Sequence, residues 1–236
     1  MDALTLKELY ESQLGEELKR PPTPDFNRRE MSCMLRVSRS MTPGALSGHD
    51  SARTWVWSDL HLGHTKTIEV FQRPFGTADE MNDTIFRNWE QVVAAADTIL
   101  ILGDVTVHGL WGRRLKRVHQ APGRKILVYG NHEITSTGLV ETNGFDEVHS
   151  SLYVEGDPPL LLTHVPLRVI PKDCVNIHGH LHHTHVPGRT RHINVCVEQL
   201  QYRPRALSAL QRLAQRLVKG GTVRGRTTGD RLDWIG

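Results

Sequence analysis

Five short clusters of polar residues have the composition of metal ligands. Each sets a histidine or an acid beside a second polar residue or a glycine, and they are Asp59-Leu-His61, Gly103-Asp104, Gly130-Asn131-His132, Leu-Thr-His164 and Gly179-His180-Leu-His182. Carboxylate, imidazole and amide groups together suit divalent transition metals. Taken singly, each cluster is better explained by a turn or by ordinary surface polarity. All five follow an apolar run, however, so we predict that they converge on one site that binds two metal ions.

The spacing within these clusters indicates how the side chains are shared. Asp59 and His61 are two residues apart, as are His180 and His182. Each pair therefore points the same way if its backbone is extended. Asp104 has two carboxylate oxygens, so it can contact both ions.

The apolar runs before the first three clusters predict a sheet that positions them. Their nearly continuous apolar character is typical of strands covered on both faces, at residues 54–58, 98–102 and 125–129. A capping box at Thr77 and Glu80, followed by apolar residues at helical spacing, predicts a helix between the first two strands. A second helix is predicted from the recurrence of Leu110, Trp111, Leu115 and Val118. This alternation indicates parallel βαβ units with right-handed crossovers.

After His132 the predicted strands follow one another more closely, and the helices between them are short or missing. The strands are expected around residues 145–149, 151–155, 159–163, 174–178 and 192–197. This crowding predicts a second, more antiparallel part of the sheet stack. A closing helix is then marked by Leu207, Leu210, Leu213 and Leu217.

The two ends of the chain differ from its middle. Residues 1–19 predict a helix because one apolar stripe is formed by Leu6, Tyr10, Leu14 and Leu18. Residues 20–53 are rich in Arg, Ser, Pro and Gly with little periodicity, which predicts a linker or a loosely attached arm without active-site residues. We therefore expect three parts: an N-terminal helix and linker extension over 1–53, a catalytic domain over 54–203, and a C-terminal helix and basic tail over 204–236.

The composition is that of a soluble globular protein, with 236 residues of which 38% are apolar and 23% charged. No apolar run approaches the roughly 18 residues of a membrane helix, and the N-terminus lacks the pattern of a secretory signal. Three cysteines without regular spacing indicate neither a disulfide framework nor a zinc ribbon. We expect a cytoplasmic protein (host cytoplasm if the gene belongs to a phage) without a membrane partner. The net charge of +3 permits an anionic substrate but does not argue for nucleic-acid binding.

Taken in order, the five clusters resemble the signature of the calcineurin-like metallophosphoesterase superfamily. The resemblance covers about residues 54–200. The run Asp59-Leu-His-Leu-Gly-His64, and Arg73-Pro-Phe75 ahead of a Trp-bearing helix, are similar to the small phosphoesterases of bacteria and phages. The resemblance implies an α/β fold, a four-layer α/β/β/α sandwich of the metallophosphoesterase type, here with an N-terminal helical and linker extension.

The resemblance also implies a role for each motif residue. One metal would be held by Asp59, His61, Asp104 and His182. The other would be held by the bridging Asp104 together with Asn131, His164 and His180. His132 would stand beside the substrate phosphate as an acid or charge stabiliser. The cofactors implied are two divalent metal ions, with Mn²⁺ expected and Fe²⁺ or Zn²⁺ as the alternatives.

This set of groups suits hydrolysis of a phosphate ester. Two metals about 3.5–4 Å apart can share a water and lower its pKa toward neutrality, so that a bridging hydroxide attacks phosphorus in line. His132 would protonate the leaving oxygen. The resemblance to small family members leads us to expect a phosphodiesterase rather than a phosphomonoesterase, acting on small diesters such as 2′,3′- or 3′,5′-cyclic nucleotides. The preference for diesters rests on the resemblance alone.

Two other functions were weighed. A nuclease acting on DNA or RNA is not favoured, because only about 30 residues follow the core where such enzymes usually add a capping domain. A catalytically inactive binding protein on the same fold would have lost ligands, whereas all seven and His132 are present here. The sequence leaves open the oligomeric state.

Several neighbouring residues have weaker indications. Glu133 is expected to orient a histidine. His64 has two equally weighted interpretations, as a substrate contact or as a polar cap of the following segment. Solvated loop positions are expected for His178, His183 and His185, and no role is expected for His108 or His149. A solvated helix face is the preferred explanation of the basic residues Arg113, Arg114, Lys116, Arg117, Arg124 and Lys125, with a nucleotide or RNA contact as the alternative.

Overall fold

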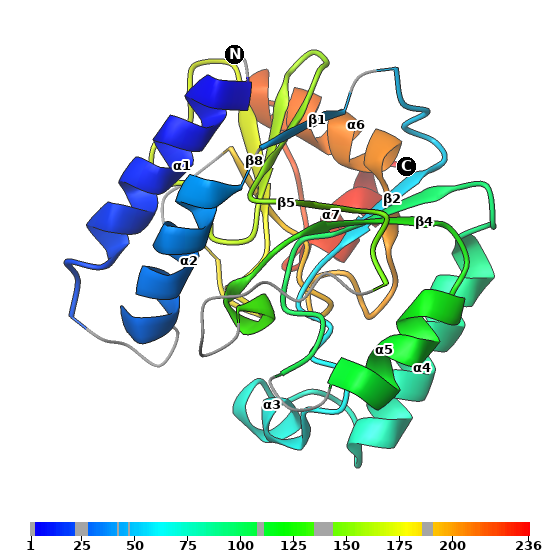
Figure 1. Ribbon diagram of the computed structural model, residues 1–236. Coiled ribbons are helices and arrows are strands. Elements are labelled where there is room, and N and C mark those ends of the chain that lie inside the picture. Colours follow the sequence, from blue (N-terminus) through cyan, green and yellow to red (C-terminus); the bar gives the residue numbers. More distant parts are fainter. Residues whose placement is uncertain are drawn as a thin grey trace.

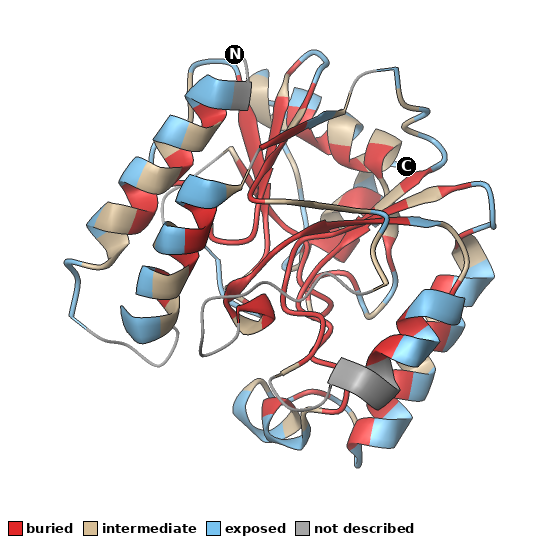
Figure 2. Ribbon diagram, viewed as in Figure 1, coloured by how far each residue is buried: buried red, intermediate tan, exposed pale blue. Residues whose placement is uncertain are grey.

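A computed structural model describes residues 3–21, 28–41, 43–46, 48–107, 111–134, 144–185 and 191–236 of the chain. Two five-stranded sheets form its centre, and helices cover their outer faces (Figure 1). Most strand residues are buried, whereas the outer sides of the helices are exposed (Figure 2). The predicted α/β/β/α sandwich is confirmed.

The first sheet has the strand order β10-β2-β3-β4-β5. Its bounds are β2 (Thr54–Trp57), β3 (Thr98–Ile101), β4 (Arg124–Val128), β5 (Glu147–His149) and β10 (Arg205–Ala206). Strands β2 to β5 are mutually parallel, and β10 lies antiparallel to β2 at the edge. The three strands predicted before the first clusters are confirmed, and because they run parallel, their carboxyl ends meet at one edge.

Helices α4 (Ala78–Val92) and α5 (Trp111–Gln120) connect these parallel strands, as predicted. Thr77 caps α4 and accepts a hydrogen bond from the Glu80 backbone N–H at 3.1 Å. The α4 residue Trp89 packs edge-on against Trp57 of β2, with ring centroids 5.4 Å apart. This contact fixes α4 on the sheet directly behind the strand that leads to Asp59.

The second sheet has the order β1-β6-β7-β8-β9. Its bounds are β1 (Gly44–Leu46), β6 (Leu152–Val154), β7 (Leu160–Thr163), β8 (Val175–His178) and β9 (His192–Asn194). Among its described pairs only β6 with β7 is antiparallel. The expectation of a more antiparallel second part is therefore wrong. One reason is that β5, which follows His132, joins the first sheet beside β4. A second reason is that an apolar run such as that of β7 fits a parallel sheet as well as an antiparallel one.

The segment before the first sheet is more ordered than its composition suggests. Helix α1 (Ala3–Glu17) buries the predicted residues Leu6, Tyr10 and Leu14. A second helix, α2 (Arg28–Ser40), follows, and β1 pairs with β6. The expectation of a linker or loose arm over 20–53 is thus wrong for residues 28–40 and 44–46.

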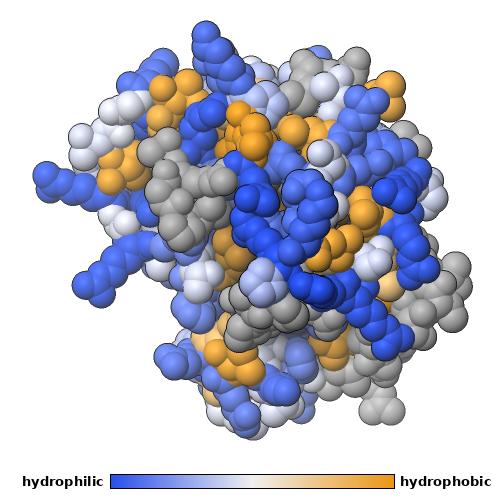
Figure 3. Space-filling model, turned by 90° about the vertical axis from the view of Figure 1, so that its left-hand side faces the viewer, coloured by the Kyte–Doolittle hydropathy of each residue, from blue (hydrophilic) through white to orange (hydrophobic). Residues whose placement is uncertain are grey.

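Helix α2 was missed because its apolar face is narrow. It buries Met31, Met34 and Val37, which are three residues apart, while four arginines occupy the remaining faces. Seen from the side of α1 and α2, the surface is mostly hydrophilic with separate apolar patches (Figure 3). The two helices therefore pack through their inner faces only.

Four further elements complete the described structure. They are α3 (Thr65–Val70), the 3₁₀ turn η1 (Asn131–Glu133), α6 (Leu207–Val218) and α7 (Thr228–Ile235). Helix α6 is the predicted closing helix, and α7 forms within the segment that we expected to be a basic tail. Leu110, His108, residues 22–24 and the side chains of Trp111, Arg113 and Arg114 lie outside the described residues. Within the described ranges, no helix combines the length and the apolar character that a membrane crossing requires.

Candidate metal centre

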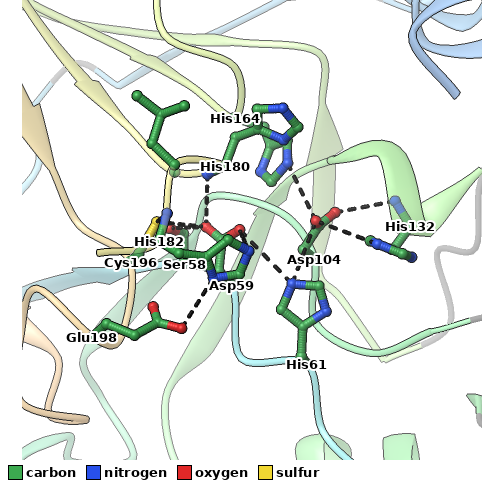
Figure 4. Close-up of polar contacts among 12 residues, drawn as sticks. Ser58, Asp59, His61, Asp104, His132, His164, His180, His182, Cys196 and Glu198 are labelled. Carbon is green, nitrogen blue, oxygen red and sulfur yellow. Dashed lines mark hydrogen bonds and ion pairs between the residues drawn. The ribbon is translucent and has the colours of Figure 1, made fainter. Parts of the chain in front are cut away.

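All predicted site residues follow the ends of five strands. Strands β2, β3 and β4 of one sheet and β7 and β8 of the other end at Trp57, Ile101, Val128, Thr163 and His178. The side chains that follow converge between the two sheets (Figure 4). The sequence-based expectation that the five clusters meet in one place is thus met by the geometry.

The first group consists of Asp59, His61 and His182. One ligand atom of each lies within 4.8 Å of the others. His61 Nε2 is 3.9 Å and His182 Nε2 is 3.8 Å from the same oxygen, Asp59 Oδ1. All three residues are at most 5% exposed.

The second group consists of Asp104, His164 and His180, which satisfy the same distance limit. His164 Nε2 lies 3.4 Å from Asp104 Oδ2 and 3.1 Å from Asn131 Oδ1. Asn131 therefore joins this group through its amide oxygen.

Asp104 connects the two groups. Its Oδ2 lies 3.6 Å from His61 Nε2 in the first group and 3.4 Å from His164 Nε2 in the second. Burial alone would raise the pKa of Asp104, but His164 and His132 beside it hold that pKa well below its ordinary value. Asp104 is therefore an anionic group in contact with both halves of the site.

The hydrogen-bonding pattern of the site is that of a cation-binding site, because several buried polar atoms have no hydrogen-bond partner among the described residues. Asp59 Oδ2 accepts hydrogen bonds from Ser58 Oγ at 2.6 Å and from the His180 N–H at 2.9 Å, while Asp59 Oδ1 is buried without a hydrogen-bond partner among the described residues. Both ring nitrogens of His61 are also buried without a hydrogen-bond partner among the described residues. Buried polar atoms rarely lack hydrogen-bond partners. A cation between the two residues would satisfy Asp59 Oδ1 and one ring nitrogen of His61.

The second group makes the same point through its acceptors. His164 Nδ1 contacts Leu102 O at 2.7 Å and donates to it, so a neutral ring would present the Nε2 lone pair to Asp104 Oδ2 and Asn131 Oδ1. Three acceptors then face one another unless a positive charge lies between them. Burial would lower the pKa of His164, but Asp104 outweighs burial and raises that pKa to about 10. Without an ion, a proton on Nε2 therefore supplies this positive charge, and a bound metal ion would replace that proton. The residues present therefore fit a divalent cation in each half.

Two further imidazoles are in the form that binds a metal. Burial lowers the pKa of His180 to about 4 and holds the pKa of His61 well below its ordinary value. Both rings are therefore neutral near pH 7, and metal ligation requires the neutral ring.

The backbone at the site is not extended, contrary to our expectation for the two residue pairs. Five of the seven predicted ligands have positive φ: Asp59 (58°), His61 (48°), Asp104 (55°), His180 (69°) and His182 (50°). Such conformations cost on the order of 1–3 kcal/mol each and persist only where the surroundings impose them. The members of each pair still face one site, but they do so through turns whose geometry no local sequence rule predicts.

Glycines leave room for this crowding. Gly103, at φ 85°, lies so close to Gly130 and His164 that a Cβ atom would overlap both. A Cβ on Gly130 would clash with the Asp104 carboxylate. Both glycines of the second and third clusters are thus explained by close approach.

The described cleft in front of these residues has a volume of about 390 Å³. His132 and His64 lie in its lining, together with Lys66, Val70 and Phe71 from α3 and its end. The His132 side chain is 23% exposed, whereas those of His61, His164 and His182 are 7% exposed or less. His132 also lies near His61 and Asp104, within the distance of a metal ligand. Its exposure to the cleft favours a place beside the substrate.

The family of the chain follows from comparison with known proteins. The family model described as calcineurin-like phosphoesterase matches residues 52–212. The chain belongs to this family. Its members use divalent metals, and together with the clustered His and Asp residues this supports a metal-dependent phosphoesterase.

Several known proteins are similar to this phosphoesterase in sequence or structure. The uncharacterized protein MJ1445 of Methanocaldococcus jannaschii is 27% identical over 183 residues, which is 73% of this chain and 95% of that protein. The Gene 66 proteins of Mycobacterium phages L5 and D29 are 36% and 33% identical over 84 residues, about 40% of their own lengths. The crystal structure of AQ665 from Aquifex aeolicus, a protein of unknown function, has a TM-score of 0.56 and 26% identity, covering 68% of this chain and 98% of that one.

Glu133 has a different role from the one expected. It was predicted to orient a histidine, but it accepts hydrogen bonds from the backbone N–H groups of Asp104, Val105 and Gly130 at 2.9, 2.9 and 2.6 Å. Burial, and then the negative charge of Asp104, raise the pKa of Glu133 to about 7. Glu133 therefore fixes the loops after β3 and β4 to each other.

The other histidines divide by environment. His183 and His185 are exposed, as expected, but His178 is 1% exposed and its Nδ1 contacts Gly179 O at 2.8 Å, so a solvated position for it is wrong. His149 contacts Glu147. His64 occupies the N-cap position of α3, but its side chain makes no capping hydrogen bond. This weakens the capping interpretation of His64, and its contact with substrate stays a prediction.

Among the described side chains of α5, the basic residues Lys116 and Arg117 are not part of the cleft lining. Lys116 and Arg117 are exposed, and Arg117 pairs with Asp83 at 2.5 Å and lies over the Phe86 ring. These contacts agree with a solvated helix face.

One buried arrangement was not predicted from the sequence. It is a series of contacts from Arg73 to Glu198 and from Glu198 to His182. Arg73 Nη2 lies 2.7 Å from Glu198 Oε1, and the same oxygen lies 3.0 Å from His182 Nδ1. Arg73 also donates to the carbonyls of Asp59 and Leu60, at 2.8 and 2.9 Å. Glu198 thus fixes the ring of His182. It follows an apolar run, as the five clusters do, and that signal could have identified it.

We expect Glu198→Gln to weaken metal binding in the half that contains His182. Loss of the charged acceptor leaves the ring less fixed and less basic, which costs about 10–100-fold in metal affinity. Calorimetric titration of metal-free protein with Mn²⁺ measures this. Glu147→Gln is the matched control, because Glu147 also contacts an arginine and a histidine, Arg124 and His149, but away from the site. Equal affinities in Glu198→Gln and wild type would contradict the assignment.

Glu133→Gln should destabilise the fold. The substitution replaces an accepting oxygen by an amide group, so at least one of three buried backbone N–H groups loses its acceptor, at about 1–3 kcal/mol. Urea unfolding of the metal-free protein gives the free energy of unfolding. The exposed Glu90→Gln should leave it unchanged. An unchanged unfolding midpoint in Glu133→Gln would show that the clamp contributes nothing.

Proposed function

We propose that this phosphoesterase is a phosphodiesterase that hydrolyses small phosphodiesters such as 2′,3′- or 3′,5′-cyclic nucleotides, with two divalent ions bound. The observation that carries the proposal is the position of Asp104 between two groups of ligands at the base of a small cleft. A carboxylate that contacts two cation positions suits a reaction in which both the attacking and the leaving oxygen carry negative charge.

The proposed ligands are those expected from the sequence. Asp59, His61, Asp104 and His182 would hold one ion, and Asp104, Asn131, His164 and His180 the other. When bound, the two ions would lower the pKa of a water and neutralise charge on the phosphoryl oxygens. We propose Mn²⁺, with Fe²⁺ or Zn²⁺ as alternatives that the same donor atoms also suit.

His132 is the proposed acid. Its backbone N–H donates to Asp104 Oδ1 at 3.0 Å, which ties the position of the residue to the shared carboxylate. Its ring stands 5.1 Å from that of His61 and borders the cleft. From there a protonated imidazole can give its proton to the leaving oxygen or stabilise charge on the phosphoryl group.

The cleft supports a small substrate. Its volume of about 390 Å³ is in the range of small-molecule sites. On one wall, His64 and Lys66 offer positive or hydrogen-bonding groups to a phosphate, and Val70 and Phe71 offer an apolar surface to a base or sugar. A polynucleotide would instead require a basic groove with stacking aromatics along its length.

Turnover of bis-p-nitrophenyl phosphate with Mn²⁺ tests the enzymatic assignment. We expect Asp104→Asn and His132→Ala each to reduce turnover at least tenfold, because the first alters the shared ligand and the second removes the acid. Metal content measured in parallel should fall in Asp104→Asn and stay unchanged in His132→Ala. His119→Ala on the exposed face of α5 is the control. Metal-loaded wild-type protein without turnover under Mn²⁺, Fe²⁺ or Zn²⁺ would instead support an inactive binding protein.

A substrate panel tests the proposed class. We expect kcat/KM for a 2′,3′- or 3′,5′-cyclic nucleotide to exceed that for a nucleoside monophosphate and for single-stranded RNA under one Mn²⁺ concentration. The cleft accommodates a single nucleotide, which is the reason for this order. Faster cleavage of RNA, with affinity that falls steeply as salt rises, would favour the nuclease.

A further inference from the structure

The N-terminal segment contributes a carboxylate to the edge of the metal centre. Helix α2 begins beside η1, the turn that carries Asn131 and His132 (Figure 1). Asn131 Nδ2 donates to Glu30 Oε2 at 3.3 Å, and Glu30 lines the cleft. The family match starts at residue 52, so this carboxylate comes from outside the matched region.

Helices α1 and α2 are fixed to the loops that follow two of the ligand-bearing strands. Beyond β4, the Tyr129 hydroxyl donates to the Met34 carbonyl of α2 at 3.1 Å. Beyond β7, Gln13 of α1 donates to the Val169 carbonyl at 2.9 Å and accepts from the Val169 and Arg168 N–H groups. These loops carry Asn131 and His164. The position of Glu30 is thus set by buried and part-buried hydrogen bonds on both sides of the second half-site.

The contact with Glu30 decides which way the Asn131 amide faces. An asparagine amide has one accepting and one donating end. With its NH₂ group donating to Glu30, the Oδ1 atom faces His164 Nε2 at 3.1 Å. The opposite orientation would set Oδ1 against a carboxylate and the NH₂ group against the place where a cation fits. Both contacts of the reversed amide are repulsive.

We propose that Glu30 is a positioning residue of the second half-site, which holds the Asn131 amide with its oxygen toward the metal. The N-terminal segment then completes this half from outside the family-matched region. The inference deepens the proposed function and rests on it only in taking Asn131 as a ligand, so its test measures metal binding directly.

The experiment is a calorimetric titration of the metal-free full chain with Mn²⁺. Glu30→Ala should lower the Mn²⁺ affinity of one of the two equivalents, the one bound at the second half-site, by about 10–100-fold. The affinity of the other equivalent should stay unchanged, since loss of an outer hydrogen-bond partner acts on its own ligand. Glu30→Gln should bind close to wild type, because the glutamine carbonyl still accepts from Asn131. Glu8→Ala, an exposed glutamate of α1, is the matched control and should not differ from wild type.

A second pair of variants tests whether Glu30 acts through Asn131. In the Asn131→Ala background, adding Glu30→Ala should cause no further loss of the second equivalent, because the group that Glu30 holds is already gone. A role limited to packing of α2 would instead give additive losses and overturn the proposal. If Glu30→Ala lowers the stability of the metal-free protein, the Glu30→Gln comparison and this cycle still decide between the two.

With one exception, the remaining outcomes are distinct from failure of the proposed function. Unchanged affinity for both equivalents in Glu30→Ala, or equal losses in Glu30→Ala and Glu30→Gln, would overturn the positioning role. Wild-type protein that binds fewer than two equivalents of Mn²⁺ is the one shared outcome, because it would overturn both the positioning role and the proposed two-ion centre. Wild-type protein that binds two equivalents with the expected variant pattern, but has no turnover, would overturn only the phosphodiesterase assignment.

Discussion

The structure depends on holding electron-rich groups together in its interior. Asp59 and Asp104 are at most 2% exposed, and imidazole rings, among them the neutral rings of His61 and His180, lie beside them. Burying a charged carboxylate is expensive unless it is paired or hydrogen bonded. The protein meets only part of that requirement. Among the described residues, Asp59 Oδ1 and both ring nitrogens of His61 are buried without hydrogen-bond partners. The scaffold must therefore impose an arrangement that becomes favourable only with cations.

The scaffold does so by joining the two sheets beneath the site. The Ser58 N–H donates to the Val195 carbonyl at 2.9 Å, and the Val197 N–H donates to the Ser58 carbonyl at 3.1 Å. These bonds connect the end of β2 in one sheet to the residues after β9 in the other. Within the first sheet, the Asp59 and His61 N–H groups donate to the Gly103 and Asp104 carbonyls, at 3.0 and 2.9 Å. The left-handed turns of the ligands are therefore determined by backbone hydrogen bonds between strand ends.

This dependence on tertiary contacts explains what could be predicted from sequence. The strands were predicted because parallel strands buried on both faces give continuous apolar runs, and the ligands because they follow those runs. Positive φ at Asp59 and His61 was not predictable, since neither residue is a glycine and no local pattern requires the turn. Glu30 lies 101 residues before Asn131, and Arg73 lies 125 residues before Glu198. At such separations no periodicity links the partners. Helix α2 was missed for a different reason, because its arginines concealed a narrow apolar face.

The two halves of the site are supported from different parts of the chain. His182 is fixed by Glu198, which lies inside the family-matched residues 52–212, whereas Asn131 contacts Glu30, which lies outside them. The proposed metal ligands carry little information about substrate, because one fold with one ligand set serves many reactions. On the proposed function, discrimination must come from the cleft walls, namely α3 with His64 and Lys66 on one side and α2 with Glu30 on another. Since Glu30 both contacts Asn131 and lines the cleft, a change in the N-terminal segment would alter metal binding and substrate choice together.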